Sequence, residues 1–450
     1  MREAKQKNTN FGELNIEFVL QEDAPDAVRI GNANRAEVKT ECPYCGHTKL
    51  YVNTQRDIFF CQHCQKKGGM LALHMQYTGI PDTKTALADL QARYDKLPEE
   101  ERKARLQRKK EEIPVESKAA NIDRRDACYR RLIAESVLSN ADRANLIARG
   151  LSEEAIQKYG IVSTPVIRKT IAEKVIGLPE ELDFRKACVA KYGSDIPGIY
   201  GENGDIYFVR LKAGMMIPVV NRNGKISMFQ IRYQNPVLPS NPTEEEKKKY
   251  AETMKKFHKY AQLSSGYMPS GCSTAGLEKV HYVGFDFSNN RTPDTVCITE
   301  GCLKADVASF LQGDMPYLAI LGVNNTNQLE NEISYCIKNG TKYFRIRYDM
   351  DFMSNDAVAM AVYQTNLMLQ SFGFESVIFK PYKPDEEWLS VYEAWKKVMN
   401  GQIGKTKKLP ALNYKVVIKK GEMRPDKLYC INDIWKPSIG KGVDDYLHNR

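Results

Sequence analysis

Four cysteines near the start of the chain have the type and the spacing of a metal site. Cys42 and Cys45 form one Cys-x-x-Cys pair, Cys61 and Cys64 form a second, and fifteen residues separate the two pairs. Each pair can hold one side of a tetrahedral Zn²⁺, and the residues between them suit a β-hairpin. Because four thiolates complete the shell and leave no position for water, we expect one structural zinc ion. The alternative is four thiols without metal at a chance spacing.

The residues around these cysteines favour nucleic acid. His47 and His63 are close enough in sequence to replace a ligand, but we expect cysteine at all four positions. Aromatic and basic side chains are interleaved here, and such a surface suits a single strand whose bases stack and whose phosphates pair with cations. A simpler role is a small core, which we expect for at least one of Phe59 and Phe60. The surrounding residues are Lys49, Tyr51, Arg56, Phe59, Phe60, Lys66 and Lys67.

Acidic residues form a second chemically suitable group in the C-terminal part. Glu300 follows the apolar run TVCIT, Asp349 and Asp351 end KYFRIRYDMD, and Asp444 and Asp445 lie in GKGVDDYL. Two residues apart on a strand, Asp349 and Asp351 would point the same way. The carboxyl ends of parallel strands meet at one crevice, where gathered carboxylates favour an oxygen-ligated ion. We therefore expect Mg²⁺ or Mn²⁺ here; taken singly, each acid is equally a candidate helix cap or solvated turn residue.

The elements that must position these residues divide the chain into four regions. The first holds the cysteines and a helical pattern, and the second is charged, as in a linker or a solvated helix. The third begins with helices and becomes β-rich, with Asn223-Gly224 as a hairpin signal. The fourth alternates strand-like and helix-like segments, the pattern of a parallel sheet, and a polar stretch at about 381–426 interrupts it as an insertion. The expected boundaries are 1–95, 96–122, 123–290 and 291–450.

Composition limits the functional classes. At 450 residues, with 42% hydrophobic and 27% charged residues, the chain is long enough for two or three folded domains. A net charge of +10 favours a polyanionic partner such as nucleic acid or nucleotides. The sequence has no apolar run of membrane-spanning length and its first residues, MREAKQKNTN, lack a signal peptide, so we expect a cytoplasmic protein with no membrane partner. Eleven scattered cysteines then suggest four metal ligands and seven buried thiols.

Several segments resemble, in order, the DnaG-type primases of bacteria and phages. TEGCLKADVASFL, AILGVNN, YDMD and the later VDD look like the TOPRIM domain shared by primases, topoisomerases and some nucleases. LIARGLSEEAIQKYGI is similar to the helix pair that opens the primase core, MMIPVVNRNGKISMFQIRY to its basic subdomain, and KYAQLSS to the segment leading into TOPRIM. The unit CPYC…CQHC…GGMLALHMQYTG resembles the N-terminal zinc ribbon. The resemblance covers most of the chain.

This resemblance implies an α/β fold with a zinc-binding β-ribbon, an α+β basic subdomain and a parallel-sheet TOPRIM domain. It implies a DNA primase, a DNA-directed RNA polymerase that makes short RNA primers from NTPs on a single-stranded DNA template in a bacterial cell. Glu300, Asp349 and Asp351 would be catalytic and, with Asp444 and Asp445, would hold the Mg²⁺ ions. For each basic position an ordinary surface cation is the alternative. The implied nucleic-acid and nucleotide contacts are Arg210, Arg232, Lys259, Tyr260, Lys304, Lys66 and Lys67.

The chain also departs from this family. Cys45 stands where the cellular enzymes usually have histidine, the aspartate pair runs into FMSNDA, and the stretch at 381–426 is atypical. GQIGKTKK is no helicase phosphate loop, because Met399 stands where its first glycine would be, and the chain ends where cellular primases continue into a helicase-docking domain. These departures favour a primase of a phage, plasmid or integrative element that works with a separate replicative helicase.

Two other functions stay open. One is another TOPRIM enzyme, a nuclease or topoisomerase, which the helix pair and the zinc ribbon disfavour. The other is a catalytically weak protein that binds single-stranded DNA in replication or its regulation.

Overall fold

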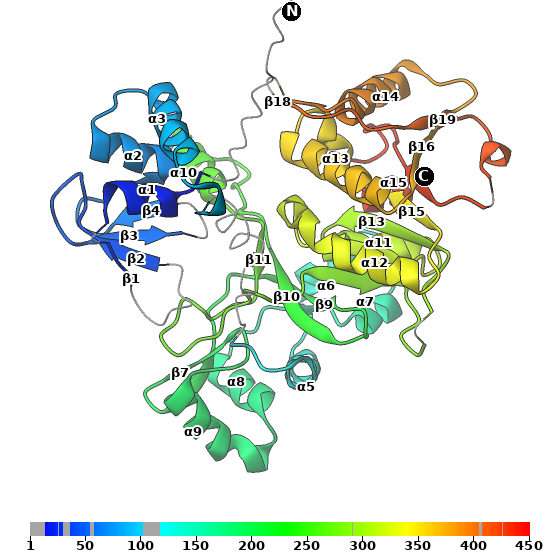
Figure 1. The fold of residues 1–450 in the computed structure, drawn as a ribbon. Coiled ribbons are helices and arrows are strands. Elements are labelled where there is room, and N and C mark those ends of the chain that lie inside the picture. The colour runs from blue at the N-terminus through cyan, green and yellow to red at the C-terminus, as the bar shows by residue number, and fades with distance from the viewer. Residues whose placement is uncertain are drawn as a thin grey trace, which may run out of the picture. The chain divides into compact units, whose positions relative to one another are not determined.

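The computed structural model describes residues 14–25, 27–29, 37–54, 58–101, 118–289, 291–404, 407–424 and 426–450. The chain forms two compact units, residues 1–114 and 115–450 (Figure 1). Arg56 and residues 102–117 of the expected linker lie outside the described residues. No helix in the described ranges has the length and apolar character needed to cross a membrane.

The first unit is an antiparallel sheet packed against helices. In β3 and β4, alternate side chains are buried, among them Leu50, Val52 and Phe59, and these contact Phe18 and Leu73 of the helices in one core. Burial of Phe59 confirms that one of the two phenylalanines fills a core. The sheet order is β1 (Val28–Arg29), β2 (Glu37–Thr40), β3 (Leu50–Asn53), β4 (Ile58–Cys61) and β5 (Lys67–Gly69), and the helices are α1 (Ile16–Asp23), α2 (Met70–Thr78) and α3 (Thr83–Asp95).

A buried ion network connects the three helices of this unit. His74 on α2 is fully buried, with Nδ1 2.6 Å from Asp23 on α1 and Nε2 3.0 Å from Asp89 on α3. Arg93 contacts both carboxylates, at 3.0 and 2.8 Å. The charge of the buried Asp23 is thus compensated by Arg93.

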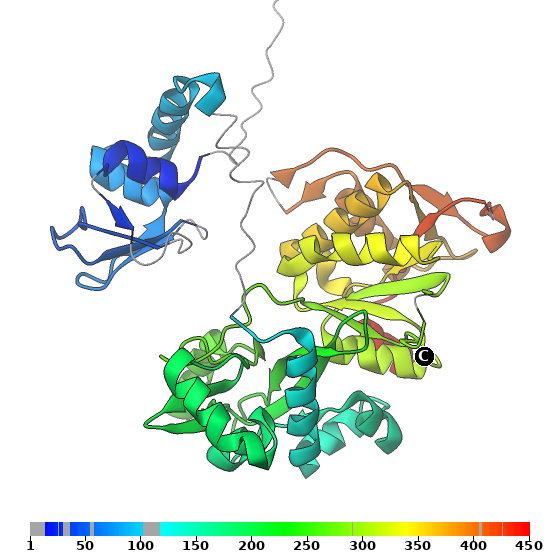
Figure 2. The same cartoon turned by 60° about the horizontal axis from the view of Figure 1, so that its bottom comes forward.

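The second unit begins with helices and an antiparallel sheet, which Figure 2 shows in cyan to green. The predicted hairpin is confirmed: β9 and β10 pair antiparallel, and the turn between them uses Asn221 Oδ1 to accept hydrogen bonds from two backbone N–H groups. Gly224 takes a φ of +73°, which glycine adopts without strain. The sheet order is β11 (Tyr260–Gln262), β10 (Ile226–Tyr233), β9 (Gly214–Val220) and β6 (Val162–Ser163).

Helices and one further hairpin surround this sheet. The helices α5 to α9 carry small apolar faces that pack on the sheet and on each other. They are α5 (Ile122–Glu135), α6 (Asn140–Ile147), α7 (Glu153–Tyr159), α8 (Arg168–Ile176) and α9 (Leu182–Tyr192), preceded by η1 (Pro179–Glu181); the hairpin is β7 (Ile199–Glu202) with β8 (Asp205–Phe208), and α10 (Glu244–Lys256) leads to β11.

The C-terminal part is a seven-stranded sheet, parallel except for β12, and this confirms the predicted parallel sheet. Its central strands are buried on both faces, as helices on both sides require. The strand order is β12 (Val280–Val283), β14 (Tyr317–Ile320), β13 (Thr295–Glu300), β15 (Tyr343–Ile346), β20 (Tyr429–Asn432), β16 (Glu375–Phe379) and β19 (Lys415–Val417). The helices are α11 (Cys302–Leu311), η2 (Val323–Gln328), α12 (Leu329–Lys338), η3 (Met350–Met353), α13 (Asp356–Ser371), α14 (Glu386–Met399), η4 (Lys420–Glu422) and α15 (Val443–His448).

The stretch at 381–426, interpreted as an insertion, contributes to this sheet. Its helix α14 buries Trp388, Val391 and Trp395, and Trp395 donates a hydrogen bond to the buried Asn432 at 3.1 Å. Its strand β19 pairs parallel to β16 and forms the edge of the sheet, and the short strands β17 (Gln402–Ile403) and β18 (Lys407–Lys408) form a hairpin. The stretch is therefore polar on average but has a buried face.

One core joins the helix pair α6–α7 to the parallel sheet. Leu146, Leu151 and Ile156 pack with residues of β9, β10 and α11. Between the two helices, Gly150 has a φ of +95°, and a Cβ there would lie 2.8 Å from His448 of α15 and 3.0 Å from Leu311 of α11. This close approach places the end of α6 directly against α15.

Candidate active site and four-cysteine cluster

The four predicted zinc ligands converge in the first unit. The Sγ atoms of Cys42, Cys45, Cys61 and Cys64 lie within 4.8 Å of one another, with Cys42 3.8 Å from Cys64 and Cys45 3.8 Å from Cys61. Each pair sits on a tight backbone turn, in which a later N–H group bonds the carbonyl of the first cysteine. Four sulfur donors at this spacing fit tetrahedral Zn²⁺.

The backbone of the turns favours thiolate at one cysteine. Burial opposes ionisation of Cys61, but N–H groups of Cys64 and His63 outweigh it and lower the pKa of Cys61 to about 7. Burial raises the pKa of Cys42 to about 12. Cys42 is therefore a thiol at neutral pH without a metal ion, and metal binding must release its proton.

His47 and His63 are exposed and stack on each other, with ring centres 3.6 Å apart and planes 14° from parallel. Their nitrogens and Cys45 Sγ also lie within 4.8 Å of one another. Since lone pairs of parallel stacked rings do not point to one centre, this arrangement supports cysteine at all four positions.

The predicted nucleic-acid side chains of the ribbon lie partly on its surface. Lys49, Lys66 and Lys67 are exposed, and Phe60 is 40% exposed. Lys66 Nζ lies 5.9 Å from the ring centre of Tyr44. Exposed cations beside an exposed ring are compatible with a single strand, which stacks and pairs at the same time.

The acidic residues lie at the carboxyl ends of neighbouring strands in the second unit. Glu300 is the last residue of β13, and Gly301 follows at a φ of +78° to begin α11. The assumption that Asp349 and Asp351 lie on a strand was wrong. β15 ends at Ile346, Asp349 caps the 3-10 helix η3, and Asp351 is inside it. Asp444 lies in the first turn of α15.

Each of the buried and half-buried carboxylates faces a cation. Lys304 Nζ is 3.1 Å from Glu300 Oε1 and 2.5 Å from Asp349 Oδ1, and so lies between them. The ammonium of Lys441 is 2.7 Å from Asp351 Oδ2 and 3.8 Å from Asp349 Oδ2.

The third carboxylate–cation contact involves the helix pair α6–α7. Arg149, next to Gly150 at the end of α6, donates a hydrogen bond of 2.8 Å to Asp444 Oδ2. Asp444 is 4% exposed, whereas Asp445 is exposed.

These contacts and the burial shift the ionisation of the group. Burial raises the pKa of Glu300, Lys304 offsets part of this, and Asp349 and Asp351 raise it further. Burial likewise raises the pKa of Asp444. Burial opposes the charge of Lys304, yet Glu300 and Asp349 raise the pKa of Lys304 above its ordinary value. Buried, mutually perturbed ionisable groups at one edge of a parallel sheet are typical of a functional site.

The donor set fits a hard divalent ion. Asp351 Oδ1 and Asp444 Oδ1 are buried and have no hydrogen-bond partner among the described residues. Beside them, a Cβ on Gly442 would lie 2.6 Å from Asp444 Oδ1 and 3.2 Å from Asp349 Oδ1, so only glycine leaves this space open. Unpaired carboxylate oxygens are the ligands that Mg²⁺ and Mn²⁺ prefer.

The carboxylates are nevertheless spread apart. In the part of the chain that the structure describes, no three carboxylates bring ligand oxygens within 4.8 Å of one another, although the four cysteines do. The ammonium of Lys304 takes the position between Glu300 and Asp349 instead.

A group of cations adjoins the carboxylates. Burial lowers the pKa of Lys259, and repulsion from Arg232, Arg149, Lys304 and Lys441 lowers it further, so these charges lie near each other. Such a concentration of positive charge attracts anions.

Three of the other predicted contacts differ in their placement. Tyr260 lies opposite Arg232 in the β10–β11 register, with Lys259 Nζ 5.8 Å from the ring centre of Tyr260. Arg232 is 9% exposed, and its Nε is buried without a partner among the described residues. Arg210 is exposed, in the segment between β8 and β9.

Sequence reasoning did not assign two of the charges, Arg149 and Lys441. Arg149 is the arginine of LIARGLS, and Lys441 lies in GKGVDD, so both belong to segments that resemble the primases. A role for either depended on the contact with a carboxylate distant in sequence, which spacing does not reveal.

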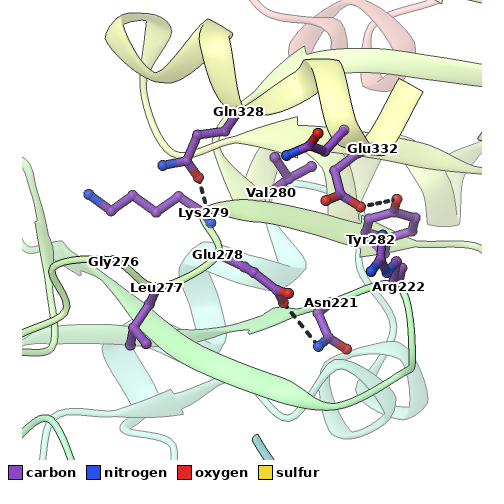
Figure 3. Close-up of a pocket in the computed structure, with 11 residues that line it drawn as sticks. Asn221, Arg222, Gly276, Leu277, Glu278, Lys279, Val280, Tyr282, Gln328 and Glu332 are labelled. Carbon is purple, nitrogen blue, oxygen red and sulfur yellow. Dashed lines mark hydrogen bonds between the residues drawn. The ribbon is translucent and has the colours of Figure 1, made fainter. Parts of the chain in front are cut away.

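A pocket of about 230 Å³ lies beside β12, between the β9–β10 turn and α12 (Figure 3). Tyr282 donates to Glu332 at 2.7 Å, and Asn221 donates to Glu278 at 3.0 Å. Burial raises the pKa of Glu332. Much of its polar lining is thus already paired, and the carboxylates around Lys304 remain the better catalytic candidates.

Comparisons with known proteins bear on the family. No family model matches the chain, and no curated protein matches it. The chain is similar to the zinc-binding and RNA polymerase domains of the Aquifex aeolicus primase, with 18% identity over 79% of this chain and 75% of that chain and a TM-score of 0.36. It is also similar to the E. coli primase catalytic core, with 17% identity over 62% and 76% of the two chains and a TM-score of 0.34.

A third similar structure is the RNA polymerase domain of the Mycobacterium tuberculosis primase DnaG in complex with double-stranded DNA. The identity is 12% over 54% of this chain and 69% of that chain, with a TM-score of 0.36. All three belong to the family that the sequence motifs resemble.

Proposed function

We propose that this protein is a DNA primase that synthesises short RNA primers from NTPs on a single-stranded DNA template. The observation that carries the proposal is the group of buried and half-buried carboxylates that follow β13 and β15 and begin α15, beside a group of cations. Carboxylates suit metal ions and cations suit phosphates, so the site can take a nucleoside triphosphate with its metal.

The acidic residues divide the work in this proposal. Glu300, Asp349, Asp351 and Asp444 would hold Mg²⁺ or Mn²⁺, with the exposed Asp445 at the margin. The ion, when bound, would lower the pKa of the attacking hydroxyl and neutralise charge on the triphosphate.

The cationic residues bind and orient. Lys259 and Arg232 would contact template or nucleotide phosphates, and Tyr260 offers a ring on which a base stacks. Lys304 would reach the phosphates from the carboxylate side. Arg210 would extend the same basic surface.

The first unit would select the template. Its four cysteines would hold one structural zinc ion, and the exposed Lys66, Lys67 and Phe60 would contact a single strand. This proposal includes the domain boundaries 1–95, 96–122, 123–290 and 291–450 and a separate replicative helicase as partner.

A second candidate function is binding of single-stranded DNA without synthesis. The ammonium between Glu300 and Asp349 favours it, because a carboxylate pair that is already neutralised has less need of a metal ion.

Primer synthesis separates the two functions. The full chain is incubated with random single-stranded DNA, labelled NTPs and Mg²⁺, and short products are resolved on a gel. A matched control is Asp294→Asn, because Asp294 is exposed and precedes β13 at the end opposite Glu300. Products from the wild type and from Asp294→Asn, but not from Asp349→Asn, support the primase. Absence of products from the wild type on every template favours the binding protein.

A further inference from the structure

Lys304 bridges two of the carboxylates that would hold the metal ion in the proposed function. It is the third residue of α11, one helical turn beyond Glu300, and its side chain is 17% exposed. Its ammonium touches Glu300 and Asp349 together, although these residues lie 49 positions apart in the chain. The fold, and not the local sequence, therefore creates the bridge.

Electrostatics explains why a cation is needed there. Glu300 and Asp349 are mostly buried, and two carboxylates in a low-dielectric site repel strongly unless one takes a proton or a cation lies between them. A tethered ammonium provides that cation at no cost in translational freedom. A divalent ion at the same oxygens would place its two positive charges within contact distance of the Lys304 ammonium, and the repulsion between them opposes metal binding.

We propose that Lys304 is an internal counter-cation that competes with a divalent metal ion for Glu300 and Asp349. Metal binding then requires the ammonium to leave Asp349. This inference rests on the proposed function only in treating these carboxylates as a metal site.

Lys441 offers the internal comparison. Its ammonium is 2.7 Å from Asp351, but its side chain is 61% exposed and can turn into solvent at little cost. Lys304 has no such freedom, because Glu300, Asp349 and α11 surround it. Lys304 should therefore oppose metal binding much more than Lys441 does.

The released ammonium would have a second use. Lys304 is close enough to Lys259 to contribute to the lowering of the pKa of Lys259. An ammonium displaced from Asp349 would remain tethered to α11, near these cations. It would then add to the charge that attracts triphosphate, so metal binding would prepare the phosphate site.

The test is the binding of Mn²⁺, followed by electron paramagnetic resonance, to the full zinc-loaded chain without nucleotide or DNA. Lys304→Gln keeps hydrogen-bond donors between the carboxylates but removes the charge, and it should bind Mn²⁺ at least about tenfold more tightly than the wild type. Lys441→Gln should change the affinity less than about threefold. Lys304→Arg keeps the charge and should bind no more tightly than the wild type.

A thermal measurement keeps the test decisive if a variant is poorly folded. Without metal, Lys304→Gln should melt at a lower temperature than the wild type, and saturating Mn²⁺ should raise its melting temperature more than it raises that of the wild type. Equal or weaker Mn²⁺ affinity of Lys304→Gln, equal stabilisation by Mn²⁺, or no Mn²⁺ binding by any of the proteins would each overturn the proposal.

The two proposals fail separately. Primers from the wild type together with unchanged Mn²⁺ affinity in Lys304→Gln would remove the counter-cation and leave the primase. Tighter Mn²⁺ binding in Lys304→Gln together with no primers from the wild type would remove the primase and leave the counter-cation.

Discussion

The cysteine cluster and the carboxylate cluster are both suited to metal ions, but the protein builds them in different ways. The four cysteines lie within one stretch of 23 residues, and two backbone turns bring their sulfurs within 4.8 Å. The carboxylates come from segments between Glu300 and Asp444, and Lys304, Lys441 and Arg149 lie among them.

The difference follows from the charge of the ligands without metal. Cys42 and Cys45 have raised pKa values and stay neutral thiols before metal binds, so the cysteines can be held together with little repulsion. Carboxylates are charged at neutral pH, so a cluster of them needs positive charge from the protein itself. The four-cysteine site can therefore be recognised from the spacing of its ligands in the sequence. The carboxylate site also includes cations of the protein, which the spacing of the acidic residues does not reveal.

The largest effect should come from removing a ligand of the four-cysteine site. Cys61→Ser removes the thiol with the lowered pKa, and three remaining thiols hold Zn²⁺ far less tightly. Because structural zinc contributes apparent binding free energies of roughly 10–16 kcal/mol, we expect loss of zinc and unfolding of the first unit. Elemental analysis should fall from one zinc per chain to none.

The same variant tests whether the two regions are independent. All three tryptophans, Trp388, Trp395 and Trp435, lie in the second unit, so their fluorescence should show an unchanged unfolding transition in Cys61→Ser. Cys188→Ser is the control, since Cys188 lies on α9, far from the cluster in sequence, and should keep its zinc. Zinc retained by Cys61→Ser would show that the spacing was misinterpreted.

The second-largest effect should come from changes in the carboxylate cluster around Lys304. Asp349→Asn and Glu300→Gln should lower primer synthesis by at least about 10²-fold, in line with the loss of one group that stabilises developing charge. The melting temperature should hardly change, because four carboxylates, Glu300, Asp349, Asp351 and Asp444, face three cations, and removal of one charge balances the cluster.

Two measurements distinguish chemistry from binding here. Single-stranded DNA affinity of both variants should equal that of the wild type. Near wild-type synthesis by either variant would remove these residues from the catalytic role, and Asp294→Asn should behave as the wild type in every assay.

The parts of the fold that could be predicted from the sequence are those with local signals. The Asn223-Gly224 turn, the alternation of the parallel sheet and the strand that ends at Glu300 each have a residue pattern that physical chemistry explains directly. The buried Phe59 follows from alternation on a short strand.

The parts that could not be predicted depend on contacts distant in sequence. The segment KYFRIRYDMD predicts a strand that continues to Asp351, yet β15 ends at Ile346, where its pairing with β13 and β20 stops. The strand β19 lies in a stretch with mostly polar neighbours, and its place at the sheet edge requires only one buried side chain, Val417. The contact of Lys304 with both Glu300 and Asp349 requires β13 and β15 to be adjacent in the sheet, and no local sequence pattern predicts that.

A third prediction asks whether the ribbon adds to template binding. The double variant Lys66→Ala/Lys67→Ala removes two exposed cations beside the four-cysteine site and changes none of the four cysteines. If each neutralises one phosphate, the slope of log affinity against log salt should fall by about 1.4 for single-stranded DNA, and affinity at low salt should fall several-fold.

The matched control for this pair is Lys247→Ala with Lys248→Ala on α10, which removes the same charge from an exposed helix of the second unit. Fluorescence anisotropy over a range of salt concentrations measures both slopes. Equal slopes for the two double variants would assign the effect to net charge and not to the ribbon.

The smallest expected effect tests the electrostatic rule on which the comparison depends, using a carboxylate that has a hydroxyl partner in place of an ammonium. Glu332 accepts a hydrogen bond from Tyr282, and burial raises the pKa of Glu332 above the ordinary 4.5. Because the folded state then holds the proton more tightly than the unfolded state, this group adds stability below pH 4.5, and that stability is lost as the pH rises through the raised pKa.

Glu332→Gln keeps the hydrogen-bond acceptor without the charge, so tryptophan-monitored urea unfolding should show a smaller loss of stability between pH 4.5 and neutral pH than in the wild type. The gain at neutral pH should be only about half a kcal/mol, because the carboxylate remains partly solvated. Glu330→Gln, on the exposed side of α12, should keep the pH profile of the wild type. Identical profiles for Glu332→Gln and the wild type would mean that burial alone does not make a carboxylate costly in this fold, and the need for Lys304 between Glu300 and Asp349 would lose its physical basis.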